Sequence, residues 1–214
     1  MSLRYALIAL LTGRPMTGYD ISKSFSRSVA HVWHAPDSQI YPELNRMERD
    51  GLLTSAEVPW GRKGTKKEYH VTEAGLAEFR EWMRSPQTPQ RQRDPAYLKA
   101  AYFDFADPEA VREQLGRQRA YWQEQLSMLE VTRAALVDRS HPTLAARLAE
   151  LSEREAELAV RFKVYAYDGL IARARTELAW IEDGFKLVDD LYRYVRGHLR
   201  GHLYDDLYDE PPGA

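Results

Sequence analysis

Two successive segments in the second half of the chain repeat an apolar residue every seven positions. The repeats are Leu115, Trp122, Leu129 and Leu136, and then Leu144, Leu151, Leu158 and Tyr165, with support from Leu148 and Phe162. A seven-residue apolar repeat is typical of helices that pack along one seam. A break at Ser140-His141-Pro142 separates the segments, so the sequence predicts an antiparallel, coiled-coil-like helical hairpin.

A further helix is predicted to follow this hairpin. From about residue 170 to residue 195, one helical stripe collects Leu178, Ile181, Phe185, Val188, Tyr192 and Val195. Upstream, Asp94-Pro95 and Asp107-Pro108 each combine a capping side chain with a proline suited to the first helical position. The second half of the chain is therefore predicted to be almost wholly helical.

The first 84 residues predict a different arrangement, which begins with two short helices. Residues 3–12 are mostly apolar and are stopped by Gly13-Arg14-Pro15. Thr17 can cap a second helix, whose expected apolar positions are Tyr19, Ile21, Phe25 and Val29.

A third helix is predicted to begin with a cap at Asp37 or Ser38 and to stop at Gly51. Pro42 lies too deep for the first helical position after such a cap, so it is expected in the first turn of a helix that starts nearer Gln39. The positions i, i+4 and i+7 predict a stripe that faces the core, made of Ile40, Leu44 and Met47.

Two strands and a fourth helix follow. Residues 52–58 and 67–71 predict strands, and the turn-rich basic stretch 59–66 joins them as a hairpin. Thr72 is predicted to cap a helix that runs to about Arg84 and turns Leu76, Phe79 and Met83 inward. This is the order of a winged helix-turn-helix. The predicted fold is therefore mainly α: an N-terminal winged helix-turn-helix with an α/β wing, plus a C-terminal α-helical, coiled-coil-like dimerisation domain.

Composition places the domain boundary after the fourth helix. Residues 85–94 carry two prolines, three glutamines and two arginines, which predicts a linker. The expected organisation is a winged helix-turn-helix over residues 1–84, a linker over 85–94, a helical dimerisation and candidate effector domain over 95–204, and a flexible tail over 205–214.

Charge and cysteine content narrow the function. The 214 residues include no cysteine, which excludes disulfides and cysteine nucleophiles and favours a cytoplasmic location. Residues 1–72 hold ten Lys and Arg against seven Asp and Glu, a net charge of +3, whereas the remainder carries −5. A mildly basic N-terminal region followed by an acidic remainder is typical of a chain whose N-terminal region binds a polyanion. The apolar run from Tyr5 to Leu11 is too short to span a bilayer, so no membrane partner is expected.

The exposed side of the third helix carries the chemistry for reading double-stranded DNA. Opposite the core stripe, it presents Ser38, Gln39, Tyr41, Asn45, Arg46 and Arg49. Gln, Asn and Arg side chains can bind base edges, and Ser and Tyr hydroxyls donate to phosphates. The hairpin adds salt-sensitive phosphate attraction through Arg62, Lys63, Lys66 and Lys67. The alternative interpretation is that both groups are ordinary solvated surface.

Several sequence blocks resemble the PadR family of bacterial regulators. They are Leu3–Leu11 (LRYALIALL) with Thr17–Ile21 (TGYDI), Ile40–Leu52 (IYPELNRMERDGL), Lys67–Gly75 (KEYHVTEAG), Leu98–Phe103 (LKAAYF) and Glu177–Ile181 (ELAWI). The resemblance covers most of residues 3–190. It implies a homodimer that binds a partly palindromic operator, with Tyr41 and Pro42 on the recognition helix and Tyr69 in a structural role. It also implies a repressor that a small aromatic effector releases.

The C-terminal helices supply candidate effector and dimer residues. The aromatic side chains that could line an effector pocket are Trp122, Tyr165, Tyr167 and Trp180, although such residues also serve core or dimer packing. The residues expected at the dimer interface are Leu115, Leu129, Leu178, Ile181 and Phe185. The pairs His31/His34 and His198/His202 lack further ligands, so no metal and no cofactor are expected.

These features favour a DNA-binding transcriptional regulator. The alternative is a winged helix that serves as a protein-interaction module on a helical dimer scaffold, without a role on DNA. Salt-dependent binding of duplex DNA separates the two hypotheses. An enzyme is not expected, since the sequence shows no nucleophile–base pair, metal cluster or cofactor loop.

Overall fold

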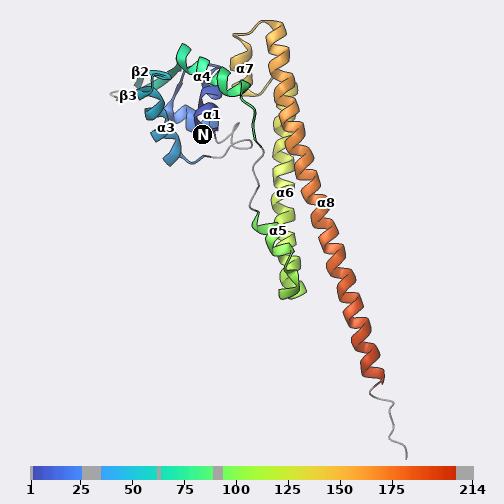
Figure 1. Ribbon diagram of the computed structural model, residues 1–214. Helices are drawn as coiled ribbons and strands as arrows, with labels where there is room; N and C mark the ends of the chain where they lie inside the picture. The colour runs from blue at the N-terminus through green and yellow to red at the C-terminus, as the bar shows by residue number, and fades with distance from the viewer. Residues whose placement is uncertain (1, 26–34, 62–63, 89–93, 206–214) are drawn as a thin grey trace, which may run out of the picture. The chain divides into compact units, whose positions relative to one another are not determined.

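The computed structural model describes residues 2–25, 35–61, 64–88 and 94–205 (Figure 1). In chain order the elements are α1 (Ser2–Leu11), β1 (Met16–Thr17), α2 (Gly18–Ser24), α3 (Asp37–Arg49), β2 (Leu53–Trp60), β3 (Gly64–Val71), α4 (Glu73–Arg84), α5 (Pro95–Ala100), the 3-10 turn η2 (Phe103–Phe105), α6 (Pro108–Val137), α7 (Pro142–Leu148) and α8 (Glu153–Asp205). The fold is mainly helical with a small sheet, as the sequence predicts.

Two compact units make up the chain. One contains Met1–Gln90 and Thr132–Ala166, and the other contains Arg91–Val131 and Tyr167–Ala214. The proposed domain boundaries around the 85–94 linker stay a prediction. Among the described helices, none is long and apolar enough to cross a membrane.

Local capping determines where several helices begin. The Thr17 hydroxyl accepts a hydrogen bond from the Asp20 amide at 3.2 Å, and the Thr72 hydroxyl accepts one from the Gly75 amide at 3.1 Å. The carboxylates of Asp94 and Asp107 likewise accept backbone hydrogen bonds, each at 2.8 Å. These caps satisfy amides that have no partner within the helix, and they confirm the predicted starts of α2, α4, α5 and α6.

The sheet has three antiparallel strands in the order β1-β3-β2. Strand β1 was not predicted, because it has only two residues and is defined by the pairing of Met16 with Tyr69. The predicted loop 59–66 is also wrong, since the strands continue until Trp60 pairs with Gly64. Pro59 is tolerated inside β2 because this strand lies at the edge of the sheet.

The winged-helix core is built by α1, α2, α3 and the sheet. Its fully buried members include Leu7, Ile8, Ile21, Ile40, Leu44 and Met47. Two expected core positions are wrong: Tyr19 is 52% exposed and Met83 is 63% exposed. Val29, another expected core position, lies outside the described residues.

The position of Pro42 also differs from the prediction. Helix α3 begins at Asp37 after a cap at Pro36, which places Pro42 inside the helix and not in its first turn. Pro42 is solvent-exposed, so its ring lies on the outer side of α3, where it does not disturb the core.

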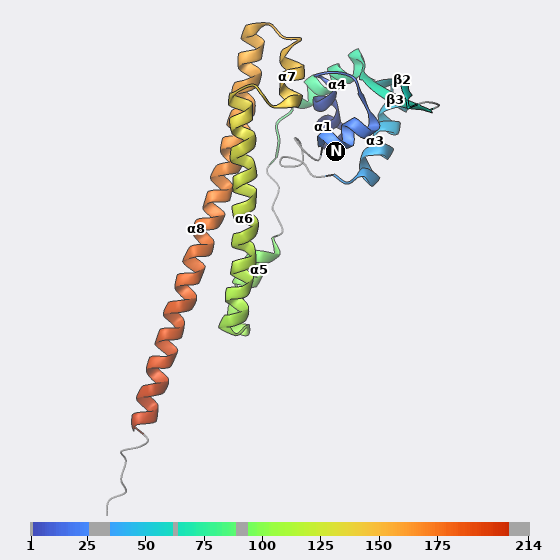
Figure 2. The ribbon, with the colours of Figure 1, turned by 180° about the vertical axis from the view of Figure 1, so that it is seen from behind.

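In the second unit, α6 and α8 run side by side in opposite directions (Figures 1 and 2). Val111 and Leu115 of α6 pack with Ile181 of α8, and Phe103, Trp122, Trp180, Phe185 and Val188 surround them. An antiparallel pairing was predicted, but with a different partner: Ile181 belongs to the stretch 170–195, which was predicted as a separate helix and is instead part of α8.

A break separates α7 from α8, where one continuous helix was predicted. The Ser152 amide donates to a Glu155 carboxylate oxygen at 3.0 Å, so a capping box begins α8. The break shifts the buried stripe to Ala156, Val160, Tyr167 and Ile171. Leu158, Phe162 and Tyr165, which the seven-residue repeat predicted to pack, are instead 48%, 69% and 77% exposed.

Candidate nucleic-acid interface

Helix α3 has one buried side and one exposed polar side. Ile40, Leu44 and Met47 are at most 1% exposed. The opposite side carries the predicted DNA-binding set, all of it exposed: Ser38, Gln39, Tyr41, Pro42, Asn45, Arg46 and Arg49. The structure therefore brings together on one surface every residue that the sequence assigned to the third helix.

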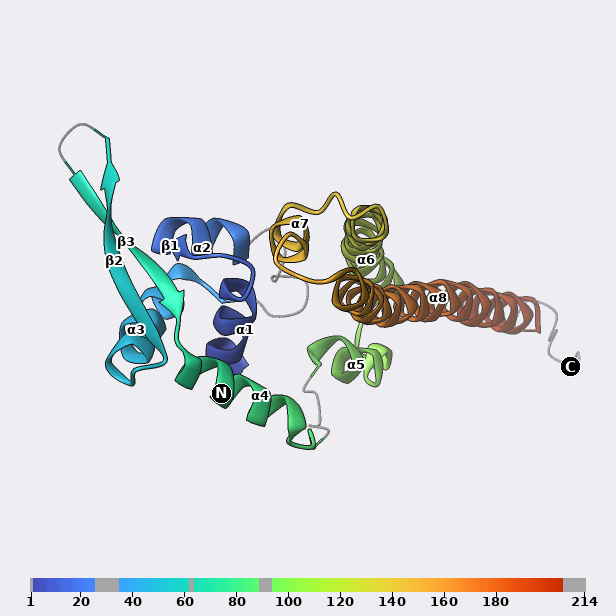
Figure 3. The ribbon, with the colours of Figure 1, turned by 90° about the horizontal axis from the view of Figure 1, so that it is seen from above.

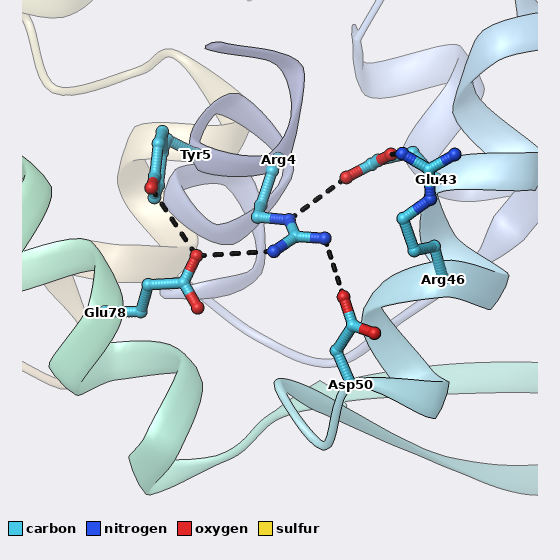
Figure 4. A network of polar contacts seen from close by, with 6 residues as sticks. All are labelled: Arg4, Tyr5, Glu43, Arg46, Asp50 and Glu78. Carbon is cyan, nitrogen blue, oxygen red and sulfur yellow. Dashed lines mark hydrogen bonds and ion pairs between the residues drawn. The ribbon is translucent and has the colours of Figure 1, made fainter. Parts of the chain in front are cut away.

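Arg4 ties this helix to two others (Figure 4). Its guanidinium lies 3.1 Å from Glu43 and 2.7 Å from Asp50, both on α3 or its C-cap, and 3.5 Å from Glu78 on α4. Burial lowers the pKa of Arg4, but the hydrogen bonds to Glu43 and Asp50 outweigh that effect and raise it. One charged side chain of α1 therefore fixes α3 at two positions.

Glu43 connects this network to the exposed surface. One of its carboxylate oxygens accepts from Arg4, and the other lies 3.5 Å from the guanidinium of Arg46. The Glu43 side chain is 12% exposed, whereas that of Arg46 is 52% exposed. A nearly buried, braced carboxylate thus orients an arginine that remains accessible to a ligand.

Asn45 and Tyr41 are also positioned by contacts with residues outside α3. The buried Tyr69 hydroxyl donates to the Asn45 side-chain oxygen at 3.5 Å, which supports the structural role expected for Tyr69. The ring of Tyr41 packs against Gly18, where an added Cβ would lie 2.7 Å from the ring. Burial and the nearby Asp37 raise the pKa of Tyr41, so its hydroxyl stays a proton donor.

The base of the wing is joined to α3 through Glu48. The Ser55 hydroxyl and the Lys67 ammonium both donate to its carboxylate, the latter at 2.9 Å. These hydrogen bonds, Ser55 first, lower the pKa of Glu48, and the bond to Glu48 raises the pKa of Lys67. Lys67 is therefore already paired in the free protein.

Near its tip, the β2–β3 hairpin extends as a two-stranded arm (Figure 3). Lys66 lies over two aromatic rings, with its nitrogen 2.8 Å from the ring centroid of Trp60 and 4.6 Å from that of Tyr19. Arg62 and Lys63, the other predicted wing contacts, lie outside the described residues. Their contact with DNA stays a prediction.

The four candidate effector residues are not gathered at one place. Trp122 and Trp180 flank the helical cluster of the second unit, and Tyr167 is 6% exposed. Tyr165 is 77% exposed and, two residues from Tyr167, points to another side of α8. A cavity of about 440 Å³ in this unit has a different lining, which includes Leu98, Tyr102, Phe103, Phe105 and Val111.

The sequence missed a polar cluster beside Trp180. Glu177 is only 8% exposed, and it accepts a hydrogen bond from the Tyr97 hydroxyl at 3.0 Å. The Tyr97 ring packs 4.7 Å from that of Trp180, centroid to centroid. The sequence signal that could have revealed this cluster is Glu177 itself, a charged residue on an otherwise apolar stripe of a predicted helix.

The predicted dimer residues are largely used within the chain. Leu115, Leu129 and Ile181 are at most 5% exposed, and Leu178 and Phe185 are half-buried. A residue must expose surface in the free chain to bury it against a partner, so Leu115, Leu129 and Ile181 have little surface left for a partner, and the assignment of the five residues to the dimer interface stays a prediction. Nearby, Leu187 and Leu191 are 59% and 55% exposed.

Of the histidine pairs considered for metal binding, His31 and His34 lie outside the described residues. Within the described residues, no group of three or more His, Asp or Glu side chains could hold a metal ion.

Comparison with known proteins assigns the family. The model of the transcriptional regulator PadR-like family matches residues 7–81. The negative transcriptional regulator PadR of Bacillus subtilis is 30% identical over 141 residues, which cover 65% of this chain and 78% of that protein. The chain belongs to the PadR-like family of transcriptional regulators.

Two solved structures extend this PadR-like similarity to the fold. Bacillus subtilis PadR in complex with operator DNA matches with a TM-score of 0.69 at 25% identity, over 88% of this chain and 99% of that chain. The complex of the same protein with p-coumaric acid matches with a TM-score of 0.66 at 24% identity, over the same shares. The match includes the C-terminal helices as well as the winged helix.

Proposed function

We propose that this PadR-like chain is a sequence-specific DNA-binding repressor that works as a homodimer. The observation that carries the proposal is the exposed polar side of α3, where Asn45, Arg46 and Arg49 stand opposite a buried apolar stripe. Asparagine and arginine match the base edges of adenine and guanine in the major groove. The Bacillus subtilis relative bound to operator DNA supports the same role for this chain.

The side chains that hold α3 favour specific recognition over general attraction to phosphate. Glu43 orients Arg46 and Tyr69 orients Asn45, so two base-reading groups are positioned before DNA arrives. Preorganisation of this kind lowers the entropy lost on binding. Ser38 and Tyr41, also exposed on α3, can donate to phosphates and so place the helix in the groove.

Control by a small aromatic effector is the second part of the proposal. The relative bound to p-coumaric acid supports an effector of that class. The cluster around Trp122 and Trp180 offers aromatic faces beside the buried carboxylate of Glu177. We infer a regulator with no enzymatic activity that acts in the cytoplasm, where its operator would be.

The test is binding of the purified chain to its own upstream DNA and to a scrambled duplex of equal length, across a salt series. We expect specific, salt-sensitive binding by a dimer. Arg46→Ala and Asn45→Ala should each weaken specific binding about tenfold and non-specific binding far less, the loss expected for one base contact. Arg80→Ala, which removes an exposed arginine of α4, is the matched control.

The outcomes separate the hypotheses. Equal losses on both duplexes would remove the base-reading role of Arg46 and Asn45. Absence of binding to any duplex at low salt would reject the DNA-binding function and make the protein-interaction module the better hypothesis.

A further inference from the structure

The wing carries an aromatic contact that its charge alone does not explain. Val58 pairs with Lys66 and Trp60 pairs with Gly64, so Trp60 and Lys66 are diagonal neighbours on one face of the hairpin. The Lys66 nitrogen lies 2.8 Å from the ring centroid of Trp60. The ammonium group is therefore directed at a ring of its own protein.

A third side chain completes the contact from outside the hairpin. Tyr19, the second residue of α2, lies with its ring centroid 6.4 Å from that of Trp60 and 4.6 Å from the Lys66 nitrogen. Both rings are about half exposed, at 56% for Trp60 and 52% for Tyr19. Cations bind the faces of Trp and Tyr rings because the faces are electron-rich. Lys66 thus joins the hairpin to α2.

The residue before Tyr19 contacts the recognition helix. Gly18 lies against the ring of Tyr41, which leaves no room there for a Cβ. Two consecutive residues at the start of α2 therefore contact the two elements proposed to bind DNA. Tyr19 contacts the wing, and Gly18 contacts α3.

We propose that Trp60, Lys66 and Tyr19 form a clasp that sets the wing at a fixed distance from the recognition helix. Lys66 then acts as a positioning residue and not as the phosphate contact expected from its charge. The role of the clasp in DNA binding rests on the proposed function. The contacts among its three side chains do not, because they form in the free protein.

A double-mutant cycle on operator binding tests this role. Lys66→Met keeps the aliphatic stem and removes the charge, and Trp60→Leu removes the ring and keeps the charge. Each should weaken binding by roughly three- to tenfold, the range for a partly exposed cation–π contact. The double variant should be no weaker than either single variant, because both break one contact. Trp60→Phe, which keeps an aromatic face, should lose less.

A phosphate contact predicts a different pattern. Lys66→Met would weaken binding, Trp60→Leu would leave it unchanged, and the double variant would match Lys66→Met. That pattern would overturn the proposal.

The free protein provides an independent measurement. The ε-methylene protons of Lys66 lie over two rings, so their NMR signals should shift upfield and should return toward the usual position in Trp60→Leu. Absence of the shift in the wild type would reject the clasp. If the wild type bound no duplex, the proposed function would fail, while the NMR signals would still decide whether the clasp exists.

Discussion

Gly75 offers a sharp test of how closely α4 packs against the hairpin. An added Cβ at this position would lie 2.4 Å from the backbone oxygen of Leu52 and 3.1 Å from a methyl group of Val71. Ordinary contacts of this kind begin near 3.4 Å, so Gly75→Ala requires the two segments to separate by about 1 Å. A backbone oxygen cannot rotate away as a side chain can.

The Leu52 carbonyl is also engaged by other groups. It accepts hydrogen bonds from the amide and the hydroxyl of Thr72, each at 3.1 Å. Overpacking typically costs about 1–3 kcal/mol, and weakening these two hydrogen bonds without breaking them adds about 0.5–1 kcal/mol in total, since the Thr72 hydroxyl also donates to the Gly51 carbonyl. Alanine recovers about 0.5–1 kcal/mol because it restricts the unfolded chain. The expected net loss for Gly75→Ala is therefore about 1–3 kcal/mol.

The assay is native-state hydrogen exchange of the full chain, which reports the stability of the winged helix separately from that of the C-terminal helices. Amides of α4 and β2 should exchange roughly ten- to a hundredfold faster in Gly75→Ala. Gly169→Ala is the matched control, because an added Cβ in that part of α8 meets nothing within 4 Å. It should be neutral or stabilising by up to about 1 kcal/mol. If Gly75→Ala behaved like the control, the crowding argument would be refuted.

Three further variants test the surroundings of α3. Arg4→Met should lower the free energy of unfolding by about 1–3 kcal/mol, since three carboxylates lose their shared cation, and an equal effect of Arg80→Met would reject this reason. Because folding lowers the pKa of Glu48, the ionised carboxylate stabilises the folded protein. This stabilisation is fully present above the pKa of the unfolded state, about 4.3, and is lost as the pH falls through the pKa of the folded state. The difference in the free energy of unfolding between wild type and Glu48→Gln should therefore shrink below about pH 4. A difference that does not change with pH would contradict this role of Glu48. Gly18→Ala should displace Tyr41 and weaken operator binding while changing unfolding by less than about 1 kcal/mol, because a ring can move; unchanged operator affinity would count against this.

Sequence reasoning succeeded where the signal is local. A cap such as Thr17 or Asp107 and a stripe such as that of α3 depend on residues within a few positions of one another. The polar side of α3 followed directly from that periodicity. The capping box at Ser152 was equally local, and it was missed because the seven-residue repeat was carried across it.

The failures concern pairings between distant segments. Strand β1 exists only because Met16 meets Tyr69, and no pattern in two residues can predict that pairing. Charge composition likewise gave no sign that Lys66 lies over rings across the hairpin and on α2, and its contact with phosphate stays a prediction. Arg4 sits in an otherwise apolar helix, and its role became evident only when Glu43, Asp50 and Glu78 were brought around it.

Pro42 has a consequence for the backbone hydrogen bonds of the recognition helix. Proline has no amide hydrogen, so the helical bond from residue 42 to the carbonyl of Ser38 cannot form. That carbonyl belongs to the first turn of α3, where Ser38 itself is an exposed residue. A phosphate can offer it nothing, because both groups are acceptors, whereas the amino group of a cytosine or an adenine can donate to it. The consequence of Pro42 is therefore one backbone acceptor in the first turn of α3 that the helix itself cannot satisfy through the i to i+4 bond, beside the residues proposed to contact DNA.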